Sequence, residues 1–205
     1  FIGTTKSDYS WTSGPGVAIS DLYHSLKGSE WDPWEYALMR SSRCLMVAVR
    51  DSLTASGLKL KGVDATAPGN PMMDGLAVNS LPSMLTPYRR LLLLCGSRMP
   101  EAINNFKRLL LAAEGGSEVM KAFLIPLGSE PSSEEIECAL NSFGYQKSDL
   151  PTKVIGVKEM WKKDSNIALV GQGKFSDWSH WAEIGLANAG TATEQLVGLG
   201  VPTLS

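Results

Sequence analysis

The chain has 205 residues, of which 43% are hydrophobic and 20% are charged, so it can bury the core of one domain or of one domain with an appendage. The formal net charge is −2 and the pI is near 5.7, whereas a nucleic-acid-binding protein is expected to have a basic surface. We therefore expect no nucleic-acid partner. Three cysteines, odd in number and far apart, fit neither a disulfide framework nor paired metal ligands. We interpret them as reduced core thiols, and we expect no metal.

The first part of the chain contains one predicted β-α-β unit. Residues 1–30 show no sustained periodicity and are predicted to be irregular. Residues 29–41 predict a helix, 43–50 a buried strand, 51–62 a second helix that Asp51 caps, and 64–71 a short extended segment.

The stretch 76–90 contains two prolines and little apolar periodicity, and we predict that it is a linker between domains. The predicted organisation is therefore a first domain over 1–75, the linker, and a second domain over 91–205. The start without methionine and an end inside a predicted strand indicate a piece of a longer protein.

After the linker, apolar strands alternate with amphipathic helices. Because the strands are continuously apolar, this alternation predicts an α/β fold, a Rossmann-like open parallel sheet with helices on both faces. Ser132 and Glu135 form a predicted capping box. The predicted strands are 91–95, 121–127, 152–157, 166–171, 185–189 and 201–205, the helices are 100–113, 132–143, 176–184 and 191–199, and 158–163 is a short unassigned segment.

In such sheets the ligand lies beyond the carboxyl ends of the strands, so the turns that leave the strands are the candidate site. Gly96 allows a sharp turn, Ser97 can cap the following helix, and Pro100 and Glu101 stand where that helix begins. The helix N-terminus carries partial positive charge and Arg98 adds a full one, which suits a phosphate. A tight turn with a surface arginine is the alternative for this stretch.

A second turn repeats the pattern near the end of the chain, where a glycine and small hydroxyl residues follow a short apolar strand. Two anion-binding turns in one parallel sheet suit a diphosphate. The residues of this turn are Gly190, Thr191, Ala192 and Thr193.

Three motifs, "CGSRMPE", "APGNPMMDGL" and "AGTATEQLVGLGVP", together resemble lipid-A-disaccharide synthase, and more closely the lipid-A-disaccharide synthase-related proteins of cyanobacteria and plastid-bearing plants. The resemblance runs the length of the chain. It implies a GT-B glycosyltransferase with two facing Rossmann-like domains, of which the carboxyl-terminal one binds a UDP-sugar. The chain would then hold the end of the acceptor-side domain, the hinge, and a donor domain incomplete at its C-terminal end.

The resemblance also implies roles for particular residues. Those beside the donor's phosphates and ribose would be Gly96, Ser97, Arg98, Glu101, Gly190, Thr191, Ala192 and Thr193, and those near the uracil Gly171 and Gln172.

Two further positions match with departures. Asp74 closes the interdomain motif, in which Asn70 replaces a histidine of the synthase. An ungapped match places Gln195 in the slot of a ribose-binding glutamate, with Glu194 one place early. Since neighbouring helical residues point about 100° apart, we predict that only one of these two side chains faces the ligand, and the match favours Gln195.

The sequence thus predicts the UDP-sugar-binding portion of an inverting glycosyltransferase, with the catalytic base outside this chain and no cofactor besides the donor. The resemblance implies an acceptor whose identity the sequence does not give, with a lipid-linked or glycolipid molecule as one expectation. It leaves peripheral membrane contact open. It implies a cytoplasmic location, or a plastid location if the protein comes from a plant. A non-catalytic nucleotide-binding or regulatory module, which Gln195 favours, and a UDP-sugar epimerase remain alternatives.

Overall fold

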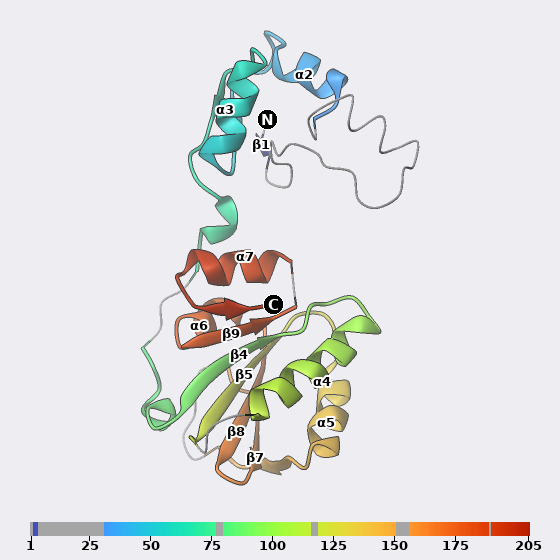
Figure 1. Cartoon of the computed structure of the whole chain (residues 1–205), viewed down its shortest axis with the longest axis vertical. Coiled ribbons are helices and arrows are strands. Elements are labelled where there is room, and N and C mark those ends of the chain that lie inside the picture. Colours follow the sequence, from blue (N-terminus) through green and yellow to red (C-terminus); the bar gives the residue numbers. More distant parts are fainter. Residues whose placement is uncertain (1, 4–30, 77–79, 116–118, 151–155, 189) are drawn as a thin grey trace. The chain divides into compact units, whose positions relative to one another are not determined.

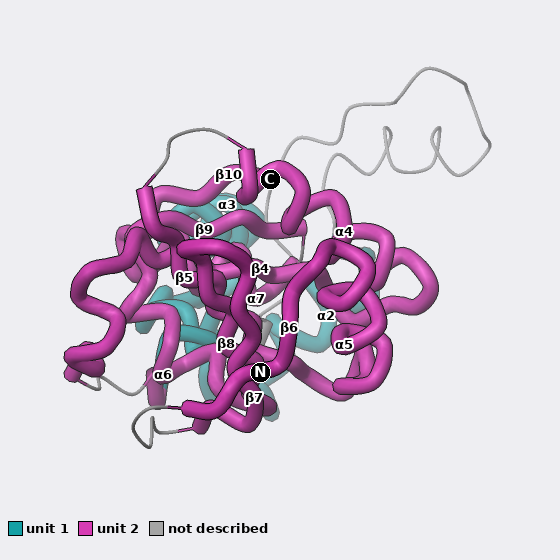
Figure 2. The backbone as a smooth tube through the Cα atoms, turned by 90° about the horizontal axis from the view of Figure 1, so that it is seen from below, with its two compact units in different colours: residues 1–74 teal, residues 75–205 magenta. Residues whose placement is uncertain are grey.

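The computed structural model describes residues 2–3, 31–76, 80–115, 119–150, 156–188 and 190–205. The chain divides into two compact units, Phe1–Asp74 and Gly75–Ser205 (Figure 2).

The first unit contains a three-stranded parallel sheet in the order β1-β2-β3. The β-α-β unit is confirmed, because β2 and β3 pair in parallel and α3 connects them, with the Asp51 side chain accepting a hydrogen bond from the amide of Thr54 at 2.7 Å. The elements are β1 (Ile2–Gly3), α2 (Pro33–Met39), β2 (Val47–Val49), α3 (Ser52–Leu60), β3 (Ala65–Thr66) and the 3₁₀ helix η1 (Pro71–Met73).

Local patterns overestimated the regular structure of this unit. The helix expected over 29–41 begins only at Pro33, and the buried strand expected over 43–50 shrinks to β2, with Leu45 and Met46 exposed. Conversely, Ile2 and Gly3 pair with β2 although residues 1–30 were predicted to be irregular; residues 4–30 of that prediction lie outside the described residues. A two-residue strand has no periodicity of its own, and only its long-range partner defines it.

The second unit contains a seven-stranded sheet in the order β10-β9-β4-β5-β8-β7-β6 (Figure 1). The strands β10, β9, β4, β5 and β8 pair in parallel in this order. The strand β7 pairs antiparallel with both of its neighbours, β8 and β6. The sheet is therefore mostly parallel. Its strands are β4 (Arg89–Leu94), β5 (Lys121–Leu127), β6 (Gln146–Ser148), β7 (Glu159–Lys163), β8 (Asn166–Gln172), β9 (Ile184–Ala187) and β10 (Thr203–Leu204).

The antiparallel edge corrects the expectation of a purely parallel sheet. The segment 158–163, to which the sequence assigned no strand, contains all of β7, and β7 and β8 make a tight hairpin in which Lys163 pairs with Asn166. Asp164 in the turn has a φ of 50°, a conformation that aspartate tolerates better than most residues. Of the strand expected over 152–157, residues 152–155 lie outside the described residues and 156–157 are not in a strand.

Helices cover both faces of this sheet, as predicted (Figure 1). Side chains alternate along β5, so that Phe123 and Ile125 pack with α4 and α5, while Ala122 and Leu124 pack on the face of α6 and α7. The helices are α4 (Glu101–Glu114), α5 (Ser133–Ser142), α6 (Phe175–Ser179) and α7 (Thr191–Gly198).

The capping box of Ser132 and Glu135 at the start of α5 is confirmed. Within the stretch 76–90, the 3₁₀ helix η2 (Ser83–Leu85) places Leu85, fully buried, in the core of the second unit. No helix in the described part of the chain is long and apolar enough to cross a membrane.

Candidate functional site

The strand order of the second unit reverses direction next to β4. From β4 the chain passes through α4 to β5 on one side, and from β8 it passes through α6 to β9 on the other side of β4. The helices that follow β4 and β9 therefore lie on opposite faces of the sheet. Such a reversal leaves a crevice at the carboxyl ends of the two strands, where α/β proteins bind their ligands.

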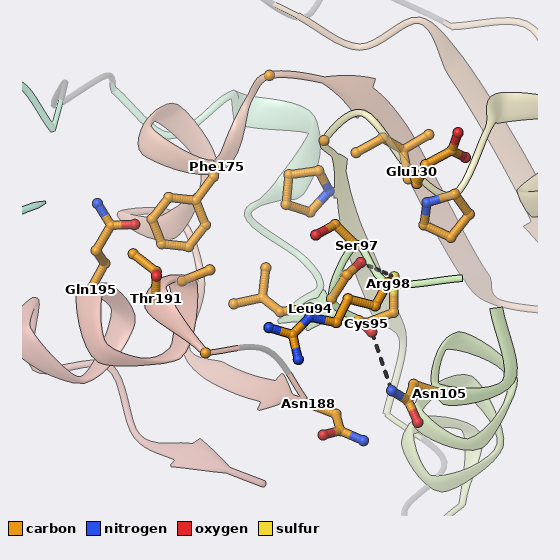
Figure 3. Close-up of a pocket in the computed structure, with 18 of the residues that line it drawn as sticks. Leu94, Cys95, Ser97, Arg98, Asn105, Glu130, Phe175, Asn188, Thr191 and Gln195 are labelled. Carbon is orange, nitrogen blue, oxygen red and sulfur yellow. Dashed lines mark hydrogen bonds between the residues drawn. The ribbon is translucent and has the colours of Figure 1, made fainter. Parts of the chain in front are cut away.

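A cavity of about 1060 Å³ occupies this position (Figure 3). Turns that leave β4, β5, β8 and β9 all contribute to its wall. The lining residues are Leu76, Leu94, Cys95, Gly96, Ser97, Arg98, Glu101, Asn105, Pro126, Leu127, Gly128, Glu130, Pro131, Gly173, Phe175, Ser176, Asn188, Gly190, Thr191, Ala192 and Gln195.

The turn after β4 touches the turn after β9. Gly96 has a φ of +83°, and a Cβ atom at this position would lie 3.0 Å from the carbonyl oxygen of Asn188. The amide of Asn188 in turn donates a hydrogen bond to the carbonyl of Leu94 at 2.7 Å. Glycine is thus required at residue 96 both by the backbone conformation and by the close approach of the second turn.

Ser97 lines the cavity but does not cap α4, contrary to the prediction. The helix begins at Glu101, and its N-cap is Pro100, which makes no side-chain hydrogen bond to the helix. The intervening turn is closed by the backbone, since the amide of Ala102 donates to the carbonyl of Arg98 at 2.8 Å. The N-cap of α4 is thus Pro100, and Ser97 contributes to the cavity wall.

Arg98 is the only lysine or arginine among the described residues that line the cavity. Its side chain extends from the β4–α4 turn toward the α7 side of the cavity (Figure 3). Glu101 and Glu130 also line the cavity. One permanent cation beside the N-terminus of a 14-residue helix makes this part of the cavity the favourable place for an anion.

The turn after β9 forms the opposite wall. Gly190 is the N-cap of α7, and its carbonyl accepts hydrogen bonds from the amides of Thr193 at 3.1 Å and Glu194 at 3.3 Å. Thr191, Ala192 and Gln195 line the cavity together with Gly190. Of the neighbouring pair, Gln195 lines the cavity and Glu194 does not, consistent with the angle of about 100° between successive helical residues.

Cys95 forms part of the cavity floor and is held in a protonated state. Burial raises the pKa of its thiol to about 11, so the thiol is uncharged near neutral pH and is a weak nucleophile. Its carbonyl accepts a hydrogen bond from the Asn105 amide at 3.4 Å (Figure 3). The expectation of core thiols holds for Cys95 but is wrong for Cys138, which is exposed on α5.

Six predicted site residues do not line the cavity, and two of them, Thr193 and Glu194, lie in the first turn of α7. Gly171 and Gln172 end β8 and do not line the cavity; a Cβ atom on Gly171 would lie 2.6 Å from the Trp178 ring, which explains this glycine by packing. The Gln172 side chain accepts a hydrogen bond from Lys158 Nζ at 2.7 Å. Asn70 and Asp74 belong to the first unit, where they flank η1 as its N-cap and C-cap.

Several lining residues were not among those predicted from the sequence. Gly128, Glu130 and Pro131 follow β5, and the rule that turns leaving strands form the site would have included them. Phe175 and Asn188 also line the wall. Phe175 follows the positive-φ Gly173 in the turn after β8, where a glycine two residues before an aromatic residue was the available signal.

A scan against protein-family models and a search of curated proteins gave no match to this chain. Within the described residues, no group of three or more histidine, cysteine, aspartate or glutamate side chains is placed to hold a metal ion.

Proposed function

We propose that this chain is the UDP-sugar-binding portion of an inverting glycosyltransferase related to lipid-A-disaccharide synthase. The observation that carries the proposal is the convergence of two glycine turns, led by Gly96 and Gly190, on one cavity at the reversal point of a mostly parallel sheet. Their sequence motifs are two of the three that carry the family resemblance.

The groups on the wall suit a nucleoside diphosphate. Arg98 and the N-terminus of α4 would hold the diphosphate, while Ser97 and Thr191 offer hydroxyl groups that can donate to its oxygens. Negative charge grows on the departing UDP during glycosyl transfer, so Arg98 would stabilise the leaving group electrostatically. The base that activates the acceptor would lie outside this chain, so the chain alone would bind without turnover.

A non-catalytic nucleotide-binding module is the second candidate. Gln195 supports it, because a neutral amide lines the cavity where the resemblance expects a ribose-binding glutamate. Both candidates bind the nucleotide. They differ in whether the complete protein transfers a sugar.

Isothermal titration tests the proposed ligand class. We expect UDP to bind more tightly than ADP, ATP or NAD, since the chain has no acidic residue about twenty positions after a G-x-G-x-x-G turn to hold the ribose of NAD. Equal or tighter binding of NAD would remove the glycosyltransferase proposal. Isomerisation of a labelled UDP-sugar without acceptor would instead identify an epimerase.

The neighbouring residues Glu194 and Gln195 provide a matched pair of variants. We expect Gln195→Ala to weaken UDP binding by roughly 1 kcal/mol, the size of one neutral hydrogen bond, as measured by titration. Glu194→Ala should leave binding unchanged and lower the melting temperature slightly, because the carboxylate stands in the first turn of α7. The reverse ranking would mean that Glu194 is the ligand-facing residue.

A further inference from the structure

The flank of the cavity formed by α6 and α7 carries an aromatic ring and no charged side chain. Phe175 is half-buried, lines the cavity, and packs against the core beneath α6 and α7. Its companions on this flank include Thr191 and Gln195 (Figure 3). Arg98 lies on the β4–α4 turn, and Glu130 lies on the turn after β5. The two sides of the cavity therefore differ in chemistry.

We propose that Phe175 is the platform on which the base of the bound nucleotide stacks, with the phosphates directed toward Arg98. This inference rests on the proposed function and adds the orientation of the ligand. A nucleobase is flat and has an apolar face, so it gains most from a ring that a protein core already holds in place. Gln195 on the same flank offers both a donor and an acceptor, which suits the ribose next to a stacked base.

The opposite flank is a poorer place for the base. Glu130 lies there beside Pro126 and Pro131, whose rings are apolar but not aromatic, so this flank offers no aromatic ring for the base to stack on. The charge of Arg98 attracts the phosphates and lies between the two flanks in Figure 3. A ligand that places its phosphates at Arg98 and its base on Phe175 satisfies both groups at once.

Stacking depends little on which base is present, and this gives the inference a distinctive signature. Removal of the ring should weaken the binding of UDP and of ADP by similar factors. The binding of inorganic diphosphate should not change, because diphosphate has no base. Discrimination between uracil and adenine must then come from other groups on the wall.

The experiment is titration of the full chain and its Phe175→Leu variant with UDP, ADP and inorganic diphosphate. We expect the variant to bind UDP at least about fivefold more weakly, with diphosphate affinity unchanged within about twofold, and we expect Phe175→Tyr to retain UDP affinity. If the leucine variant melts far below the parent, Phe175→Met takes its place, since the flexible thioether side chain adapts better to the space that the ring leaves.

Phe143→Leu is the matched control, because Phe143 packs against the core on the opposite face of the sheet, with α4 and α5, and does not line the cavity. It should leave the affinities for all three ligands unchanged. Unchanged UDP affinity in Phe175→Leu, or an equal loss of UDP and diphosphate, overturns the stacking inference alone. A parent chain that binds diphosphate but not UDP removes the proposed function and this inference together.

Discussion

Replacement of Arg98 by alanine is expected to weaken UDP binding by about 1.5–3 kcal/mol, or roughly 10- to 150-fold, as measured by titration. Arg98 is the only cationic side chain among the described lining residues, so no neighbouring lysine or arginine on that wall can replace it. Uridine lacks phosphates, and its affinity should change little.

Arg108→Ala is the matched control for this prediction, because Arg108 is exposed on α4 and does not line the cavity. Both variants remove one positive charge from the same region of the chain. If the two bind UDP equally well, Arg98 is a surface residue and the diphosphate lies elsewhere.

Replacement of Lys121 by methionine is expected to lower the free energy of unfolding by about 2–4 kcal/mol, since hydrogen bonds from a charged group to buried partners are the strong ones. Lys121 is 7% exposed, and its ammonium donates to the carbonyls of Ala113, Glu114 and Gly115 at 3.0, 3.1 and 2.8 Å. Methionine keeps most of the side-chain length but leaves the last carbonyls of α4 without this donor.

Chemical denaturation measures this loss, with Lys107→Met as the control. Lys107 is exposed on α4, and its replacement should change stability by less than about 0.5 kcal/mol. Equal stability of the two variants would show that water satisfies the carbonyls at the end of α4.

Elements with strong local signals were predictable from the sequence. The strand at 121–127 has the predicted bounds, because a largely apolar segment of only seven residues fits a strand better than a helix. The helix α5 begins where Ser132 and Glu135 predict, since capping is an interaction between residues three apart.

The antiparallel edge was not predictable in this way. The strands β6 and β7 are short, and no local pattern states whether a neighbour runs parallel or antiparallel. Their direction follows from a hairpin, in which β7 leads through Asp164 directly into β8. The role of Ser97 was also not predictable from local sequence. Its residue type and position suggested a helix cap, but the helix begins at Glu101 and Ser97 lines the cavity.

The sequence by itself determined the α/β class, the covering of the sheet on both faces, and the two glycine turns, because apolar periodicity, caps and tight turns depend on residues close together in the chain. Only the tertiary structure decided which turns meet. Gly96 and Asn188 are far apart in sequence and touch because β4 and β9 are neighbouring strands. The same packing brought Phe175 to the cavity wall and kept Gly171 away from it, since which side chains share a cavity depends on strand order and on how each helix lies over the sheet.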